Sequence, residues 1–69
     1  MIAVFETNVP NNTQANQILA LLKKMSPSST INFDLSDGEK ILRIDGNLAS
    51  IKTISRYLHN LGITCEILA

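Results

Sequence analysis

Apolar and polar residues follow one another along this chain with two different periods, and each period predicts one kind of element. The first run, Ile2–Thr7 (IAVFET), is rich in β-forming residues, and Pro10 after it fixes φ and lacks an N–H donor. We therefore predict a strand over residues 2–7. Apolar side chains then return every three or four positions, at Ala15, Ile18, Leu19, Leu22 and Met25. This helical spacing predicts a helix over residues 13–25.

The second half of the chain repeats this change of period. A serine-rich loop over residues 26–30 leads into residues 30–35, where apolar and polar side chains alternate, which predicts a half-buried strand. Asp37-Gly38 is typical of a two-residue hairpin turn, so we expect this strand to pair with another over residues 40–45. A second helical stripe follows at Leu48, Ile51, Ile54, Leu58 and Leu61. Gly62 stands where helices commonly end, which predicts a helix over residues 48–61 and a last strand over residues 63–69.

The order of predicted elements is βαββαβ. Right-handed crossovers in its two halves place the strands in the spatial order 4-1-3-2, antiparallel throughout, with both helices on one face. This is an α+β, ferredoxin-like sandwich. A chain of 69 residues is long enough for one such domain only, over residues 1–69.

Composition narrows the classes of partner. Hydrophobic residues make up 45% and charged residues 17%, which is typical of a folded domain, and the net charge is zero. Such a chain has no overall field to attract nucleic acid or an anionic membrane. It has one cysteine, no signal-peptide pattern and no apolar run long enough to span a membrane. We expect a cytoplasmic protein with no nucleic-acid or membrane partner.

The junction between the first strand and the first helix resembles a binding loop without reactive groups. Residues 8–17 (NVPNNTQANQ) contain amides and hydroxyls but no acid, base, histidine or cysteine. The structural interpretation is that the Asn and Thr side chains cap the first turn of the helix. The alternative is that the helix N-terminus holds a small anion.

Around this loop the spacing resembles the heavy-metal-associated domain of copper chaperones and metal-pumping ATPases. Members carry a Met-x-Cys-x-x-Cys loop, with Ala directly after the second Cys and an aliphatic residue three positions later. Ala15 and Ile18 fit that frame, which puts Val9 at the family's Met and Asn11 and Gln14 at its two cysteines. The resemblance implies the same fold, but the ligands of the metal are replaced by amides.

Later segments extend the resemblance over nearly the whole chain. Leu42, Ile44 and Gly46 match the family's VxVxG strand, and Ile63 replaces the Tyr or Lys that usually overlooks the metal. Copper(I) selects soft thiolate ligands, and zinc requires about four N, S or O ligands. We therefore predict no transition-metal site in the loop and no cofactor.

The remaining residues give no sign of a catalytic site. Cys65 lies in the last predicted strand and fits a small buried hydrophobe, and His59 fits a surface position near the end of a helix. The acids are scattered singly, and no nucleophile has a base placed beside it by a motif. Alternation assigns Phe5 and Phe33 to the buried face, so the aromatic platform of an RNA-recognition sheet is missing. We predict a protein that is not an enzyme.

The strongest candidate surface is the face of the sheet that the helices leave open. Alternation sends Ile2, Val4 and Glu6 to that face, and Ile41 and Arg43 of the neighbouring strand join them. The charged residues of the two predicted helices are all basic: Lys23, Lys24, Lys52 and Arg56. A basic helix layer can dock an acidic partner.

The predicted function is a protein-interaction or regulatory module that binds a protein partner or itself, as in a dimer, through the open sheet face or the helix layer. Ile2, Val4, Ile41 and Arg43 are the predicted interaction residues. Two alternatives stay open. One is a metal-handling protein with atypical ligands, such as Cys65 shared across a dimer, and the other is a small-anion sensor that uses the amide-rich loop.

Overall fold

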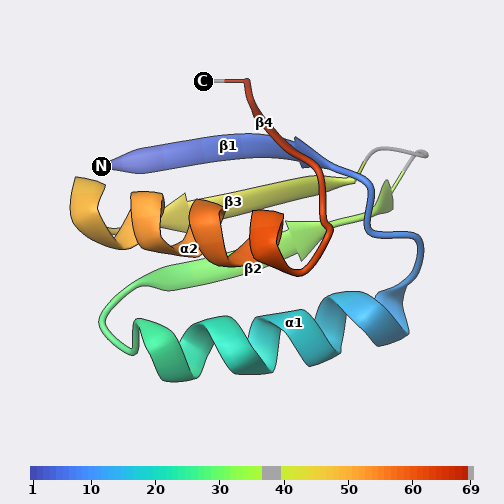
Figure 1. Ribbon diagram of the computed structural model, residues 1–69, viewed down its shortest axis with the longest axis horizontal. Coiled ribbons are helices and arrows are strands. Elements are labelled where there is room, and N and C mark those ends of the chain that lie inside the picture. The colour runs from blue at the N-terminus through green and yellow to red at the C-terminus, as the bar shows by residue number, and fades with distance from the viewer. Residues whose placement is uncertain (37–39, 69) are drawn as a thin grey trace.

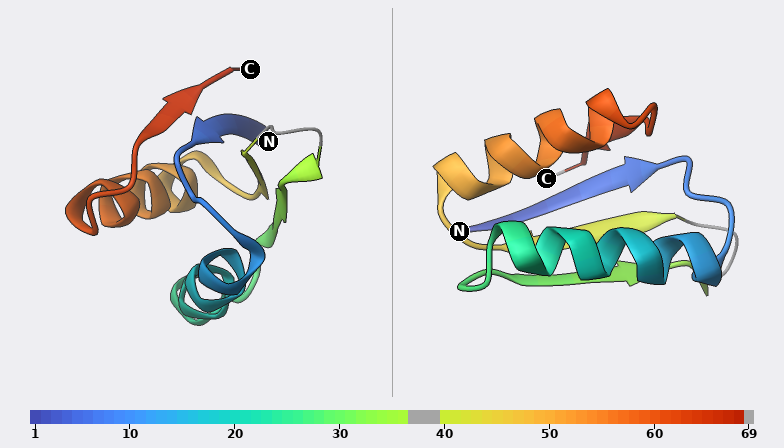
Figure 2. Two further views of the ribbon diagram at one scale, coloured as in Figure 1. Left: turned by 90° about the vertical axis from the view of Figure 1, so that its right-hand side faces the viewer. Right: turned by 60° about the horizontal axis from the view of Figure 1, so that its bottom comes forward.

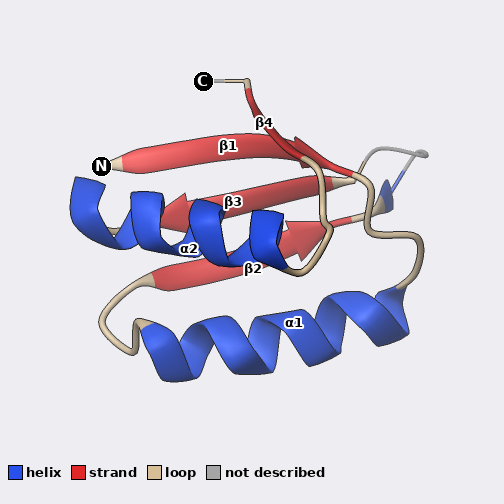
Figure 3. Cartoon of the chain, viewed as in Figure 1, coloured by secondary structure: helices blue, strands red, loops and turns tan. Residues whose placement is uncertain are grey.

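The structure, a computed structural model, describes residues 1–36 and 40–68. Six elements follow one another in the predicted order (Figures 1 and 3): β1 (Ile2–Thr7), α1 (Asn12–Met25), β2 (Thr30–Asp34), β3 (Ile41–Asp45), α2 (Leu48–Asn60) and β4 (Cys65–Ile67). The predicted βαββαβ order is therefore confirmed. The predicted hairpin turn at Asp37-Gly38 lies outside the described residues.

The four strands form one antiparallel sheet in the order β2-β3-β1-β4. This is the predicted 4-1-3-2 order counted from the opposite edge. Helices α1 and α2 pack against the same face of the sheet, and neither of them covers the other face (Figure 2). The chain thus has the predicted ferredoxin-like fold.

The core lies between the sheet and the two helices. Alternate residues of the strands point into it, and each helix contributes one stripe. Its buried members are Ala3, Phe5, Val9, Ala15, Ile18, Leu22, Ile31, Leu42, Ile44, Ile51, Ile54 and Leu58. Burying each large aliphatic side chain contributes about 1.5–3 kcal/mol, so this one cluster is the main source of stability.

Asparagine side chains define where both helices begin. The Oδ1 atom of Asn11 accepts a hydrogen bond from the Gln14 N–H at 2.9 Å, and that of Asn47 accepts from the Ser50 N–H at 2.8 Å. These caps satisfy backbone donors that have no partner within the helix. Because Asn11 is the cap, α1 begins at Asn12, one residue earlier than predicted.

The end of α2 follows the predicted glycine. Gly62 has a φ of +82°, and its N–H donates to the His59 carbonyl at 3.0 Å while the Ile63 N–H donates to the Leu58 carbonyl at 2.9 Å. Glycine adopts this left-handed conformation without a Cβ penalty. Leu61 is the cap of the helix, so α2 ends one residue earlier than predicted.

The last strand is shorter than predicted. We predicted residues 63–69, but β4 comprises only Cys65–Ile67, and Ala69 lies outside the described residues. The Thr64 N–H donates to the side-chain oxygen of Asn8 at 3.0 Å rather than to a neighbouring strand. This hydrogen bond joins the β1–α1 loop to the start of β4 and delays strand pairing by two residues.

Candidate functional site

The polar side chains of the β1–α1 loop are used to hold the loop itself. Asn11 caps α1, and Asn8 accepts the Thr64 N–H. The Thr7 hydroxyl donates to the Lys40 carbonyl at 3.0 Å and accepts from the Val9 N–H at 3.4 Å. These contacts favour the structural interpretation of the loop as a helix start.

The two positions that correspond to the family's cysteines lie side by side. The hydrogen bond from the Gln14 N–H to Asn11 Oδ1 joins them, and both residues are exposed. Val9, at the position of the family's Met, is buried in the core. Within residues 1–36 and 40–68, no three His, Cys, Asp or Glu side chains come together in a group that could hold a metal ion. The loop offers neutral amide oxygens, which are poor ligands for soft ions.

Cys65 lies on β4 directly opposite Thr7, half-buried against the core. Burial raises the pKa of its thiol from the ordinary value of 9.0 to about 11. Since the thiolate is both the nucleophile and the metal ligand, this environment disfavours either role at neutral pH.

The four predicted interaction residues do come together on the open face. Ile2, Val4, Ile41 and Arg43 alternate with side chains that are buried on the helix side. Val4 is the cross-strand partner of Arg43, and Ile41 is the partner of Glu6. Ile2 is 60% exposed, whereas Val4 and Ile41 are partly buried by their neighbours.

Strand β4 and the residue that follows it add two side chains to this face that were not predicted as part of the site. Glu66 is the cross-strand partner of Glu6, and Leu68, 55% exposed, donates its N–H to the Val4 carbonyl at 2.7 Å. Because Cys65 faces the core, alternation alone indicates that Glu66 and Leu68 point outward. That regularity in the sequence could have identified them.

Acidic residues also gather on the open face. Asp34 on β2 and Asp45 on β3 alternate with helix-facing neighbours, so they join Glu6 and Glu66. Every acid in the described part of the chain is therefore on this face, with Arg43 as the one cation among the strand residues. The pKa of the Asp34 carboxyl is lowered. The largest cause is a hydrogen bond from the Ser36 hydroxyl, followed by one from the Ser36 N–H and by the positive charge of nearby Arg43. Asp34 therefore keeps its negative charge at neutral pH.

The helix layer carries the opposite charge. Lys23 and Lys24 on α1 and Lys52 and Arg56 on α2 are exposed, and neither helix contains an acid. Across the described ranges, one ion pair forms, between the N-terminal amine and Asp45 at 3.8 Å. The helix cations thus have no anionic partner among the described residues.

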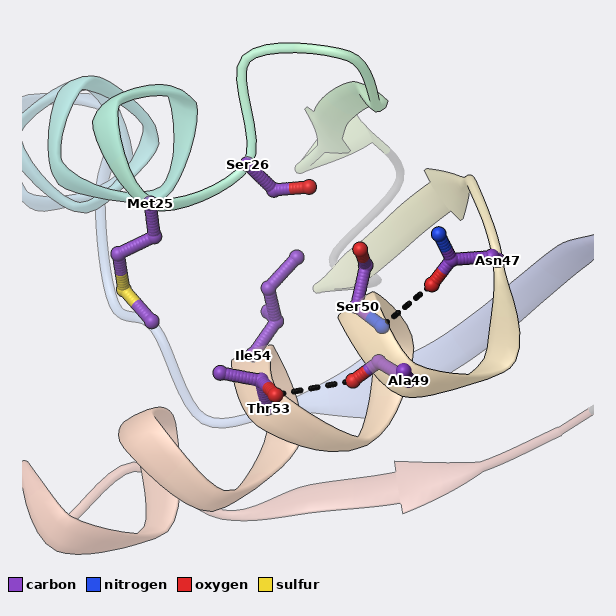
Figure 4. Close-up of a pocket in the computed structure, with 7 residues that line it drawn as sticks. All are labelled: Met25, Ser26, Asn47, Ala49, Ser50, Thr53 and Ile54. Carbon is purple, nitrogen blue, oxygen red and sulfur yellow. Dashed lines mark hydrogen bonds between the residues drawn. The ribbon is translucent and has the colours of Figure 1, made fainter.

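Among the described residues, two of the hollows lie between these elements. One, of about 220 Å³, lies between the end of α1 and the first turns of α2 and is lined by Met25, Ser26, Asn47, Ser50 and Thr53 among others (Figure 4). The Asn47 side chain caps α2, and the Thr53 hydroxyl donates to the Ala49 carbonyl at 2.9 Å. No charged side chain lines this hollow, and these two polar groups already serve the helix.

The second hollow is a groove of about 380 Å³ between α2 and the β1–β4 edge of the sheet. Its lining is mostly apolar, from Phe5, Leu48, Ile51 and Ile67, and also includes Ser55 and the exposed cations Lys52 and Arg56. Leu48 and Ile67 are 50% and 67% exposed, so the apolar surface here is open to a partner. We refer to it as the α2–β4 groove.

Comparison of the chain with protein-family models, with curated proteins and with solved structures gives no match. In the part of the chain that the structure describes, neither α1, with 14 residues, nor α2, with 13, is long and apolar enough to cross a membrane.

Proposed function

We propose that this chain is a heavy-metal-associated-like domain without metal ligands, and that it acts as a non-enzymatic protein-interaction or regulatory module. The open sheet face is the surface that binds. The observation that carries this proposal is a group of aliphatic side chains on that face that neither α1 nor α2 covers: Ile2, Val4, Ile41 and Leu68.

The arrangement of these side chains distinguishes them from scattered surface residues. Ile2 and Val4 belong to β1, Ile41 belongs to β3 on one side of it, and Leu68 directly follows β4 on the other side. Charged residues lie directly beside them, with Asp45 opposite Ile2, Arg43 opposite Val4 and Glu6 opposite Ile41. Adjacent exposed apolar residues of this kind mark sites of interaction more often than single ones do.

The surroundings of the loop amides and of Cys65 also support an interaction role over a metal-binding or anion-binding one. The loop amides are engaged in capping and in loop closure, and burial raises the pKa of the Cys65 thiol. Neither observation favours metal handling or anion sensing. The open sheet face has no such internal role, because its side chains point away from the core.

The test uses the double variant Ile2→Asp/Ile41→Asp. Two new carboxylates on the open face should at least halve self-association or the recovery of cross-linked partners, because charge is poorly tolerated at the centre of an interface. Native mass spectrometry measures self-association, and cross-linking in the cells of origin followed by affinity capture measures partner binding.

Leu21→Asp provides the matched control, since Leu21 is 43% exposed on α1 and receives the same kind of change. It should leave both readouts unchanged. Unaltered binding by the sheet-face variant would refute this proposal, and a loss seen only with Leu21→Asp would assign binding to the helix layer instead.

A further inference from the structure

Two pairs of like charges lie on different faces of the domain, one on the open sheet face and one on α2. Glu6 and Glu66 face one another across β1 and β4 on the open sheet face, and like charges at that position destabilise a sheet. Lys52 and Arg56 are four residues apart on α2, where like charges destabilise a helix. Neither pair forms a salt bridge within residues 1–36 and 40–68.

The spacing within the two pairs is similar. Directly opposed residues of antiparallel strands have Cβ atoms about 4.5–5.5 Å apart, and residues four apart on a helix have Cβ atoms about 5–6 Å apart. Two carboxylates at one spacing can therefore meet two cations at nearly the same spacing. Such contact would relieve the repulsion within both pairs together.

The apolar surroundings of the two pairs are also complementary. Ile41 and Leu68 flank the glutamate pair and project from the sheet face. The cation pair lines the α2–β4 groove together with the apolar side chains of Phe5, Leu48, Ile51 and Ile67. A projecting aliphatic surface with acids beside it thus matches a mostly apolar groove that includes two bases.

We propose that the partner of the open sheet face is a second copy of this chain, which docks its α2–β4 groove over Glu6 and Glu66 of the first copy. This inference rests on the proposed function and names its partner. Lys52 and Arg56 of one copy pair with the two glutamates of the other, and an aliphatic side chain beside the glutamates enters the groove.

The geometry determines the kind of assembly. Glu6 and Glu66 lie on one face of the sheet, and the groove is lined by Phe5 and Ile67 on the other face, so the interface joins two different surfaces. A head-to-tail interface of this kind continues from copy to copy and produces a ring or a stack instead of a two-fold dimer. Because its ion pairs lie at the surface, added salt weakens it.

The experiment uses two variants, each of which disables one surface. Glu6→Gln/Glu66→Gln alters the sheet face and leaves the groove intact, and Lys52→Gln/Arg56→Gln does the reverse. Each alone should self-associate roughly tenfold more weakly than the wild type in low salt. Mixed together, they retain one intact sheet face and one intact groove between them, so they should form a one-to-one heterodimer that grows no further.

Native mass spectrometry and sedimentation velocity provide the readouts, in low salt and in about 0.5 M NaCl. Lys23→Gln/Lys24→Gln removes the same charge from α1, away from the groove, and should associate as the wild type does. Amide NMR spectra confirm that each variant is folded. A wild type that stays monomeric in low salt, variants that associate normally, or a mixture without heterodimer would each overturn the inference.

These outcomes are distinguishable from failure of the proposed function. If the wild type is monomeric but Ile2→Asp/Ile41→Asp still reduces recovery of cross-linked partners, the sheet face binds a different protein and only the self-docking inference is wrong. If the sheet-face changes affect neither self-association nor partner recovery, both proposals are wrong.

Discussion

Partial burial makes the thiol of Cys65 less reactive than an exposed one. Its side chain lies on the helix-facing side of β4 opposite Thr7, and burial raises the pKa of the thiol to about 11. Relative to an ordinary thiol at 9.0, the thiolate fraction at neutral pH falls by roughly 100-fold. The residue is therefore better suited to packing than to nucleophilic or ligand chemistry.

This environment predicts slow alkylation of the folded protein. Iodoacetamide should modify Cys65 at about pH 7.5 at least roughly 100-fold more slowly in the folded domain than in urea, because only the thiolate reacts. The folded rate should keep rising about tenfold per pH unit beyond pH 9, since the thiol is not yet ionised there. Mass spectrometry of the modified chain gives both rates. A plateau of the folded rate near pH 9 would contradict the raised pKa.

The same shift sets the sign of a stability effect. The folded thiol ionises near 11 and an unperturbed one near 9.0, so the unfolded chain loses this proton first as pH rises. The contribution of Cys65 is therefore fully present below pH 9 and is lost as pH rises toward 11. Urea unfolding of the wild type and of Cys65→Ser should diverge over that range.

Among the elements, those with a strong local pattern were predictable, and those whose ends depend on distant contacts were less so. Both helical stripes and the two central strands were identified within a residue or so, because Asn caps, Pro10 and Gly62 act locally. The length of β4 was overestimated, since the Asn8–Thr64 hydrogen bond joins segments 56 residues apart in sequence.

In the candidate site, the face on which each side chain lies was predictable from the sequence, but the pairing between strands was not. Alternation correctly placed Ile2, Val4, Ile41 and Arg43 on one face. It could not show that Glu66 stands opposite Glu6, because that pairing depends on the register of two strands at opposite ends of the chain. The acidic character of the face emerges only when all four strands are placed side by side.

The β1–α1 loop provides an element-scale test of the family resemblance. Asn11→Cys/Gln14→Cys, made in a Cys65→Ser background, places two thiols at positions that a 2.9 Å hydrogen bond already joins. We expect this variant to bind one copper(I) ion, because two neighbouring thiolates suit that soft ion. Native mass spectrometry and competition with a copper(I) chelator measure the binding.

Each single-cysteine variant in the same background is the control and should bind copper(I) far more weakly. Loss of the Asn11 cap should lower the free energy of unfolding of the double variant by about 1 kcal/mol without metal. A double variant that is folded but binds no better than either single variant would show that the loop does not have the geometry of the metal-binding family.

On the scale of the whole molecule, the net charge is zero, but acidic and basic side chains lie on different surfaces. The described acids lie on the open sheet face, and the helix layer carries only basic charges on its Lys and Arg residues. A neutral chain has weak colloidal repulsion, and one with opposite charges on opposite faces also attracts a second copy in a defined orientation. This separation of charge therefore favours contact between two copies in one orientation over contact in random orientations.

The repulsion between Glu6 and Glu66 should destabilise the isolated domain. Replacing Glu66 with Gln removes the repulsion with Glu6, so the free energy of unfolding of the monomer should rise by about 0.2–1 kcal/mol. The same substitution should weaken self-association, because one of the two carboxylates that meet Lys52 and Arg56 is gone. Urea unfolding at low protein concentration and sedimentation velocity at high concentration measure the two effects separately.

If Glu66→Gln raises the free energy of unfolding but weakens self-association, the glutamate pair lowers the stability of the monomer and contributes to binding. Such a trade-off between stability and function is common at functional surfaces. In about 0.5 M NaCl both differences should shrink together, since both are electrostatic and lie at the surface. If Glu66→Gln stabilised the monomer and left association unchanged, Glu66 would be a tolerated surface residue, and the glutamate pair would have no part in assembly.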